Sequence, residues 1–412
     1  MKWRLNIAAI VIIIFIFFNE VGLPHGLQYT ALLAPFFFIK FGLKYKAAFK
    51  GFFLLSLFYL IAHLFNDEVV WFYYGRSYVL HCLVFIQVIA FYHIVNYKSH
   101  VLKQAFDIGV YLNLFLLIIG VIFLFAGNKG LMFEVSKVSA SLGVIPRFRI
   151  FTPEPSYYSM LFAIPLFFYL SQPISRDKKI DFGRIAIIVL SLLISFSFGT
   201  LSVIFISAFI VYFLRAKNIL DLNSRFLIVL AAIFVVVAFV GAFIVAPNNP
   251  VFVRLGDIIA GNDTSGNGRI FDPWILTFRM LGKNGDYLFG IGWGQIRIIG
   301  DSIIRDFYQY THDPATKFGL PNILTEITTM FGFAGLTLVV LFQVLMFRVT
   351  KVYRSNFRSL IFWFIFIYQF TGSYSSSVMY YCYWVLAFSP RFDKQIKIAL
   401  SPIATLNKKE NE

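Results

Sequence analysis

Long apolar runs recur along the whole chain of 412 residues, and short charged stretches separate them. A helix needs about 20 apolar residues to cross the hydrocarbon of a bilayer, and somewhat fewer where the bilayer is thinned. The runs therefore predict an all-α, polytopic membrane protein with about 12 transmembrane helices. The spans we expect are 6–23, 28–43, 47–65, 77–95, 106–126, 157–171, 185–198, 200–214, 226–246, 320–347, 359–372 and 376–390.

The composition excludes most other classes of protein. Apolar residues make up 59% of the chain and charged residues 14%, whereas a soluble domain has about 45–50% and about 25%. One core could not bury this much apolar surface, so the sequence excludes a soluble enzyme, a secreted disulfide scaffold and a disordered chain. Cys82 and Cys382 both lie in expected spans, which predicts neither a disulfide framework nor a zinc site. Residues 1–412 are thus expected to form a single integral membrane domain.

The formal net charge of +16 is an orientation signal. With twelve spans and the N-terminus inside, the cytoplasmic segments hold 24 of the 36 Lys and Arg residues, as expected for short cytoplasmic loops. Both termini are then cytoplasmic, and the charge indicates membrane lipid and no nucleic acid as a partner. One long helix over 185–214 would reverse this orientation downstream, but the charge bias and a turn near Gly199 favour two short helices.

Two external connections are long, at 128–156 and at 247–319. The second is rich in aromatic residues, which favours an ordered cap on the bundle. External basic residues are mostly Arg, whose planar guanidinium binds phosphate and carboxylate well. Pairing with the external acids is the alternative for any one of them, but an anionic ligand explains the set better: Arg76, Arg147, Arg149, Arg254, Arg269, Arg279, Arg297 and Arg305.

The segment Arg147–Ser156 precedes the sixth expected span. Its two prolines prevent an earlier helix start, and Ser156 is expected to cap the new helix. Glu154 is then held at the membrane surface beside Arg147 and Arg149. It is a candidate general base, or a group that orients an acceptor hydroxyl. The alternative is that Glu154 only complements the helix dipole.

Residues 269–279 predict a short amphipathic helix at the membrane interface. Arg269 and Arg279 stand about 80° apart around such a helix, at 100° per residue, so they could flank one groove. A local pair of Arg269 with Asp272 is the alternative. The Gly290–Gly294 segment, which contains Trp293, predicts a tight turn at the mouth of the bundle. The apolar side chains that could enter lipid or the bundle are Ile270, Phe271, Trp274, Ile275 and Phe278.

Polar residues also gather before and at the start of the tenth span. His312 and Asp313 are adjacent in the long external loop, while Asn322 and Glu326 share one helical face. An ionisable residue within a span is by default a candidate for function, and a buried structural hydrogen bond is the alternative for Glu326. We interpret the histidines of the early spans as hydrogen-bonded core residues, namely His63, His81 and His93.

At these residues the sequence resembles the O-antigen polymerase (Wzy) family, within the O-antigen ligase and polymerase superfamily. The resemblance is strongest over about 140–335 and rests on four motifs. Arg279 also precedes Gly290 by eleven positions, similar to the Arg-x10-Gly pattern of polymerase outer loops. The sequence after His312 departs from the ligase pattern of His-Asn/Ser-x-x-Leu. The motifs are Arg149…Glu154-Pro-Ser156, Ser195–Thr200, Ser265–Arg269…Gly290–Gly294 and His312…Asn322…Glu326.

The resemblance implies a C-type glycosyltransferase-like enzyme of the bacterial inner membrane. It would polymerise oligosaccharide repeat units carried on undecaprenyl pyrophosphate at the periplasmic face, without a metal or other cofactor. A protein that regulates chain length is a further partner that it suggests. The alternatives are an O-antigen ligase that transfers the polymer to lipid A core and a lipid-linked oligosaccharide flippase.

The resemblance and the residue chemistry together assign candidate roles. Candidate catalytic residues are Glu154 first, then His312 with Asp313, and Glu326. Candidate pyrophosphate-binding residues are Arg147, Arg149, Arg269 and Arg279, and candidate substrate-positioning residues are Ser156, Tyr157, Trp293 and Asn322.

Overall fold

The computed structural model describes most of the chain. Several of the sequence predictions lie outside its described residues, namely the span 226–246, Arg254, Ser265–Asn267 of the loop motif, and the pair His312 and Asp313. The described residues are 6–18, 29–66, 68–98, 100–127, 130, 132–137, 144–171, 181–219, 253, 268–284, 286–309, 319–372 and 376–390.

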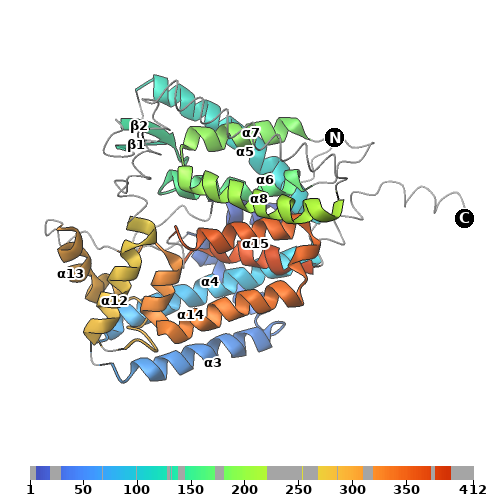
Figure 1. Ribbon diagram of the computed structural model, residues 1–412. Helices are drawn as coiled ribbons and strands as arrows, with labels where there is room; N and C mark the ends of the chain where they lie inside the picture. The colour runs from blue at the N-terminus through green and yellow to red at the C-terminus, as the bar shows by residue number, and fades with distance from the viewer. Residues whose placement is uncertain are drawn as a thin grey trace, which may run out of the picture.

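The described part of the chain is mostly helical, with one small β-hairpin (Figure 1). Helical segments occur at each of the predicted spans that fall on described residues. In chain order the elements are α1 (Ile7–Ile13), η1 (Ile14–Phe18), η3 (Tyr29–Leu33), α2 (Ala34–Phe41), α3 (Lys46–His63), α4 (Trp71–Tyr97), α5 (His100–Phe125), β1 (Phe133–Lys137), β2 (Val144–Phe148), α6 (Pro155–Leu170), α7 (Phe182–Ser195), α8 (Phe198–Ile219), α12 (Asp272–Asn284), α13 (Ile296–Tyr308), α14 (Ile323–Val349), η4 (Val352–Arg354), α15 (Asn356–Tyr368) and α16 (Val378–Phe388).

Four of the described helices are long enough and apolar enough to cross a membrane, namely α3, α4, α5 and α14. The other apolar helices contribute shorter apolar segments of 10–17 residues, such as Phe198–Phe213 of α8. Two of the long helices begin earlier than the sequence predicts, since α4 starts at Trp71 and α5 at His100. Arg76 therefore belongs to the first turns of α4 and not to the preceding connection.

The break between α7 and α8 confirms that residues 185–214 form two helices. Phe196 ends α7 in the left-handed conformation at φ 51°, and α8 begins two residues later. Both helices pack against α6.

Helix α14 differs from the uninterrupted span predicted at 320–347, because Gly332 breaks it at φ 65° and ψ −171°. The loop before α13 fills the break. The amides of Phe333 and Ala334 donate to the carbonyls of Tyr287 and Leu288, at 2.9 and 3.1 Å. Two amides of the Gly290–Gly294 turn donate to carbonyls on the other side of the break. Irregular backbone within a membrane helix is tolerated where other protein groups satisfy it.

The connection at 128–156 contains the antiparallel strands β1 and β2, so the all-α prediction needs correction here. The register pairs Phe133 with Phe148 and Glu134 with Arg147. Both Phe side chains are buried. Periodicity did not indicate these strands, because each is only five residues long and its pairing partner lies across a connection.

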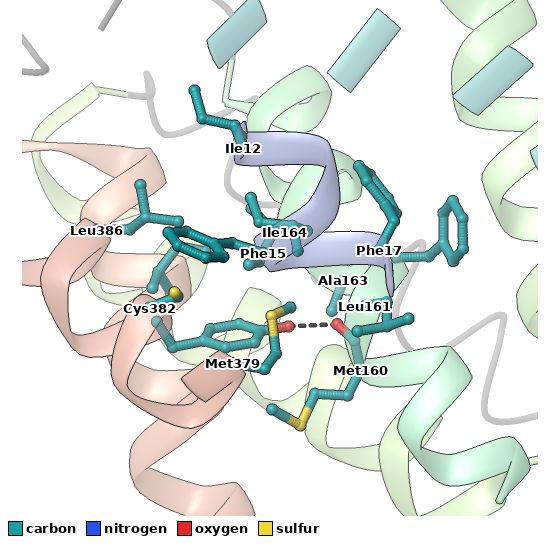
Figure 2. Close-up of a cluster of buried hydrophobic side chains, with 14 of the residues drawn as sticks. Ile12, Phe15, Phe17, Met160, Leu161, Ala163, Ile164, Met379, Cys382 and Leu386 are labelled. Carbon is teal, nitrogen blue, oxygen red and sulfur yellow. Dashed lines mark hydrogen bonds between the residues drawn. The ribbon is translucent and has the colours of Figure 1, made fainter. Parts of the chain in front are cut away.

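Helix α6 lies at the centre of the bundle. Apart from Tyr157 and Leu170, every residue of α6 is buried, as expected for a helix that is apolar all round. Figure 2 shows Ile164 of α6 among side chains of the N-terminal helices and of α16. The hydroxyl of Tyr383 on α16 donates to the Met160 carbonyl of α6. The start of α6 is therefore fixed relative to the rest of the bundle.

Helices α12 and α13 pack on each other and on the first turns of α14. The Tyr308 hydroxyl at the end of α13 donates to Asp272 at the start of α12, at 2.9 Å. The hydroxyls of Thr277 on α12 and Thr329 on α14 lie 2.9 Å apart. In Figure 1 these helices lie at the same end of the bundle as the β-hairpin.

Candidate functional site

The turn between β2 and α6 is held by its own side chains. The Thr152 hydroxyl donates to the carbonyls of Arg149 and Glu154, at 2.6 and 2.9 Å. The Arg149 guanidinium folds back to the carbonyls of Thr152 and Pro153, at 3.3 and 3.1 Å. Ile150 adopts φ 51°, a left-handed conformation that is unfavourable for a β-branched residue and costs about 1–3 kcal/mol. Surrounding contacts hold this strained turn in one conformation.

Glu154 is the residue immediately before α6, and Pro155 occupies the first helical position. This corrects the expectation that Ser156 caps the helix. Proline already has the backbone angle of a helix start, so α6 begins at Pro155 and its cap position is Glu154. The Ser156 hydroxyl instead donates to the Glu154 carboxylate, at 2.8 Å. The carboxylate therefore has a fixed orientation at the positive end of the helix.

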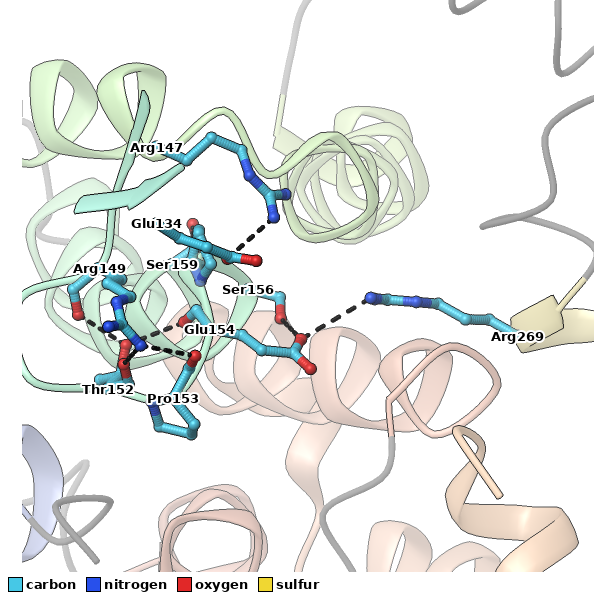
Figure 3. A network of polar contacts seen from close by, with 10 residues as sticks. Glu134, Arg147, Arg149, Thr152, Pro153, Glu154, Ser156, Ser159 and Arg269 are labelled. Atoms are coloured by element: carbon cyan, nitrogen blue, oxygen red, sulfur yellow. Dashed lines mark hydrogen bonds and ion pairs between the residues drawn. The ribbon is translucent and has the colours of Figure 1, made fainter. Parts of the chain in front are cut away.

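The ion-pair partner of Glu154 comes from a distant segment, as Figure 3 shows. The Arg269 guanidinium lies 3.7 Å from the Glu154 carboxylate, and the two side chains are 36% and 49% exposed. The sequence predicts Arg147 and Arg149 beside this carboxylate. In the structure Arg147 pairs with Glu134 across the hairpin at 2.9 Å, and Arg149 binds carbonyls of its own turn. Among the described arginines, Arg269 is thus the one whose guanidinium faces Glu154.

Asn322 holds the backbone of Arg269. It is fully buried, and its amide donates to the carbonyls of Arg269 and Phe370, at 3.0 and 2.8 Å. Its side-chain oxygen accepts from the amides of Leu324 and Thr325 and caps α14. The sequence predicts Asn322 as a residue that positions substrate. The structure places it beneath Arg269, where it positions the guanidinium instead.

A layer of buried hydroxyls lies beside Ser156. Ser159 on α6 and Ser195 at the end of α7 are both fully buried, and their hydroxyls lie 2.6 Å apart. The Ser197 and Thr200 hydroxyls are 3.1 Å apart in the following turn. The Ser195–Thr200 motif, although far from Glu154 in sequence, therefore contacts the first turns of α6 through Ser159. Sequence reasoning identified the motif but not Ser159 as its partner.

An apolar pocket, which the sequence does not predict, lies beside the same turn. Ile150, Phe151 and Thr152 form one wall, and side chains of the N-terminal helix, α5 and α6 form the others. Two polar residues in its lining satisfy each other, since the Tyr158 hydroxyl donates to Asn113 at 2.6 Å. Asn113 in turn donates to a buried serine of α7. The pocket is small, with room for about one water molecule, so it does not hold a lipid chain.

Arg279 makes a different contact from Arg269. Its guanidinium lies over the Phe307 ring of α13, 5.0 Å from the ring centroid, while Arg269 faces Glu154. The groove expected between the two guanidiniums is therefore not formed by these contacts. The reason is that Arg269 precedes α12 and Arg279 lies within it.

Trp293, Glu326 and Tyr157 occupy three separate places. Trp293 is 6% exposed and packs against the rings of Tyr74 and Phe331, at 5.6 and 4.9 Å. Glu326 is partly buried one turn below Asn322 and interacts electrostatically with Tyr381 of α16. Tyr157 is partly buried at the start of α6. Their predicted roles toward substrate stay predictions.

The histidines of the early spans have hydrogen-bond partners, as the sequence interpretation expects. His63 is fully buried between the Tyr74 hydroxyl and the Phe289 carbonyl, each at 3.0 Å. His81 binds a carbonyl of its own helix, and His93 binds the Tyr45 hydroxyl, both at 2.8 Å. Within the described ranges, no three His, Cys, Asp or Glu side chains lie close enough to hold a metal ion.

The sequence matches no protein-family model and no curated protein. The fold defines a mostly helical chain in which four described helices are long and apolar enough to span a membrane. The resemblance to the O-antigen polymerases therefore rests on the motifs quoted above.

Proposed function

We propose that this protein is a membrane glycosyltransferase of the O-antigen polymerase type. It would join oligosaccharide repeat units carried on undecaprenyl pyrophosphate at the periplasmic face of the bacterial inner membrane. The observation that carries this proposal is the partly exposed ion pair of Glu154 and Arg269 at the start of α6.

The pair has the chemistry that such a transfer needs. An acceptor hydroxyl oxygen bonds to the anomeric carbon of the donor while the bond from that carbon to the phosphate oxygen breaks. The electron pair leaves with undecaprenyl pyrophosphate, and a guanidinium such as Arg269 stabilises that charge. The hydroxyl proton passes to the Glu154 carboxylate, which acts as the general base.

We also propose the twelve-span topology, with both termini in the cytoplasm and the segments 128–156 and 247–319 outside. Helix α14 supports this placement. Arg269 is bound to the residue that caps its start, and the positive residues Arg348, Lys351 and Arg354 lie at its end. A spanning helix thus separates the candidate site from a cluster of positive charge, as the positive-inside rule requires.

A reconstituted reaction tests the proposal. Purified protein in vesicles is incubated with its undecaprenyl-pyrophosphate-linked repeat unit, and products are resolved on a gel. We expect a ladder of polymer. Transfer of a finished polymer to lipid A core without chain extension would favour the ligase, and passage of labelled lipid across the bilayer without polymer would favour the flippase.

The Glu154→Gln variant tests the site itself. Loss of the base is expected to slow chain extension by about 10²–10⁴-fold, because the amide keeps the shape of the side chain but cannot accept the proton. Asp306→Asn is the matched control, since Asp306 is an exposed carboxylate on α13. Wild-type rates in the Glu154 variant would remove Glu154 from the mechanism.

A further inference from the structure

Helix α12 is apolar on two opposite faces. One face packs against α13 and α14 and contains Leu276, Met280 and Leu281, which are at most 1% exposed. The other contains Ile275 and Phe278, which are 44% and 48% exposed, and Phe271, immediately before the helix and 64% exposed, extends it. At 100° per residue these three side chains fall within about 60° of helix. They form one exposed apolar stripe, here named the α12 stripe.

The α12 stripe continues onto a helix of membrane-spanning length. The Phe278 ring lies 6.1 Å from the Phe333 ring of α14. Tyr287 and Leu288, which fill the break in α14, are 47% and 57% exposed and extend the apolar surface. Beyond them the exposed side of α14 presents further apolar residues, namely Leu338, Leu341 and Phe342. A single apolar surface therefore runs from α12 onto α14.

The length of α14 indicates the depth at which α12 lies. Its 27 residues would extend about 40 Å as a straight helix, more than the hydrocarbon thickness of about 30 Å. With Arg348 at the inner border, the outer border falls about 20 residues earlier, near residue 328. Thr329 is the residue that bonds to Thr277 of α12. Helix α12 thus crosses α14 at the outer border of the hydrocarbon.

Two cationic side chains follow one edge of the α12 stripe. Arg279 and Lys283 are both exposed, and they stand about 80° and 120° around the helix from Phe271. A helix with an apolar stripe edged by Arg and Lys is typical of an interfacial helix that lies in the plane of the membrane. With the α12 stripe in the hydrocarbon, Arg279 and Lys283 would lie at the level of the lipid phosphates.

We infer that α12 is seated in the outer leaflet, with Phe271, Ile275 and Phe278 among the acyl chains of bilayer phospholipid. Arg279 and Lys283 bind the phosphates of the same lipids. The inference rests on the membrane placement in the proposed function and is independent of the glycosyl transfer. We call this placement of α12 in the outer leaflet the lipid seat. Since Arg269 lies just before α12, the lipid seat also fixes how far the Arg269 guanidinium lies from the membrane surface.

Photolabelling of the wild-type chain tests this seat. The protein is reconstituted at low density in vesicles whose phospholipid carries a photoreactive group on the acyl chain, then digested with trypsin. The α12 stripe falls in the peptide Ile270–Arg279, a largely buried part of α13 in Ile298–Arg305, and α14 in Phe318–Arg348. We expect label on the α12 and α14 peptides, at least about tenfold above the α13 peptide.

The three peptides separate the possible failures. Label on α14 without label on α12 would overturn the lipid seat and leave the membrane placement intact. Absence of label on both would overturn the placement itself. Loss of the α12 label at high protein density, with α14 still labelled, would show that a second copy covers the stripe and would also overturn the seat.

A substitution tests the phosphate contact. Lys283→Gln leaves the Ile270–Arg279 peptide unchanged and removes one charge at the edge of the stripe. In anionic vesicles we expect its α12 label to fall about fivefold, which corresponds to about 1 kcal/mol per cation near an anionic surface. In zwitterionic vesicles, whose phosphates are balanced by positive headgroups, the same variant should lose less label than in anionic vesicles. An unchanged label in anionic vesicles would contradict the assignment of Lys283 to phosphate.

Discussion

Arg269 and Arg358 stand at opposite ends of α14 and show two different uses of the same side chain. Arg358 is 2% exposed, and its guanidinium donates to the carbonyls of Ala387 and Thr350, both at 2.8 Å. Those carbonyls lie at the C-terminal ends of α16 and α14, where a cation is favourable. Arg269 is 36% exposed and faces a carboxylate that is itself half exposed.

The difference indicates which arginines are open to a ligand. A buried guanidinium surrounded by carbonyls has its donors occupied by the fold, and its removal costs stability. A partly exposed guanidinium opposite a carboxylate retains a solvent-facing side at which an anionic group can bind. Exposure and partner type therefore separate the two roles better than residue type does. Three substitutions test this contrast, from the largest expected effect to the smallest.

Arg269→Gln is expected to change activity and leave stability almost intact. Removing one preorganised donor to a departing anion slows a reaction by about 10²–10³-fold, while an exposed ion pair contributes at most about 1 kcal/mol to stability. Chain-extension rates and thermal unfolding in detergent measure the two quantities. Arg297→Gln, an exposed residue of α13, is the control. A large loss of stability with normal rates would assign Arg269 a structural role.

Arg358→Met should show the opposite pattern. The substitution leaves one buried and one partly buried carbonyl at helix ends without their donor, so we expect the free energy of unfolding to fall by about 2–4 kcal/mol. Equilibrium unfolding in detergent measures the change, and the exposed Arg354 provides the matched control as Arg354→Met. Equal stabilities of the two variants would contradict the structural role.

Asn322→Asp separates two functions of one buried residue. The carboxylate can still accept from the amides that cap α14, but it cannot donate to the carbonyls of Arg269 and Phe370. We expect a loss of activity of about tenfold as Arg269 moves relative to Glu154. Stability should fall by about 3 kcal/mol, because the buried carboxylate then faces two carbonyl oxygens. Asn322→Ala removes the same donors and the cap without burying a charge, and it should be more stable than the Asp variant. An Asp variant as stable as the Ala variant would argue that position 322 does not face these carbonyls.

Much of the helical framework is predictable from the apolar runs, because each run specifies a helix locally. The break at Gly332 and the β1–β2 hairpin are not predictable from these runs, since both depend on backbone partners from elsewhere in the chain. Gly332 needs the Tyr287 and Leu288 carbonyls beside it. The hairpin needs pairing across a connection. The local sequence pattern does not indicate such distant partners.

By itself, the sequence determined that this chain is helical and apolar enough for a membrane, and that Glu154 precedes a central helix. Pro155 and the apolar run that follows it specify the start of this helix through interactions between residues close in sequence. Only the tertiary structure decided which arginine faces Glu154. Arg147 and Arg149 are close to Glu154 in sequence, but Arg147 pairs with Glu134 in the hairpin and Arg149 binds carbonyls of its own turn. Asn322 anchors the segment that brings Arg269 to the carboxylate instead, because long-range packing sets the position of a segment so far along the chain.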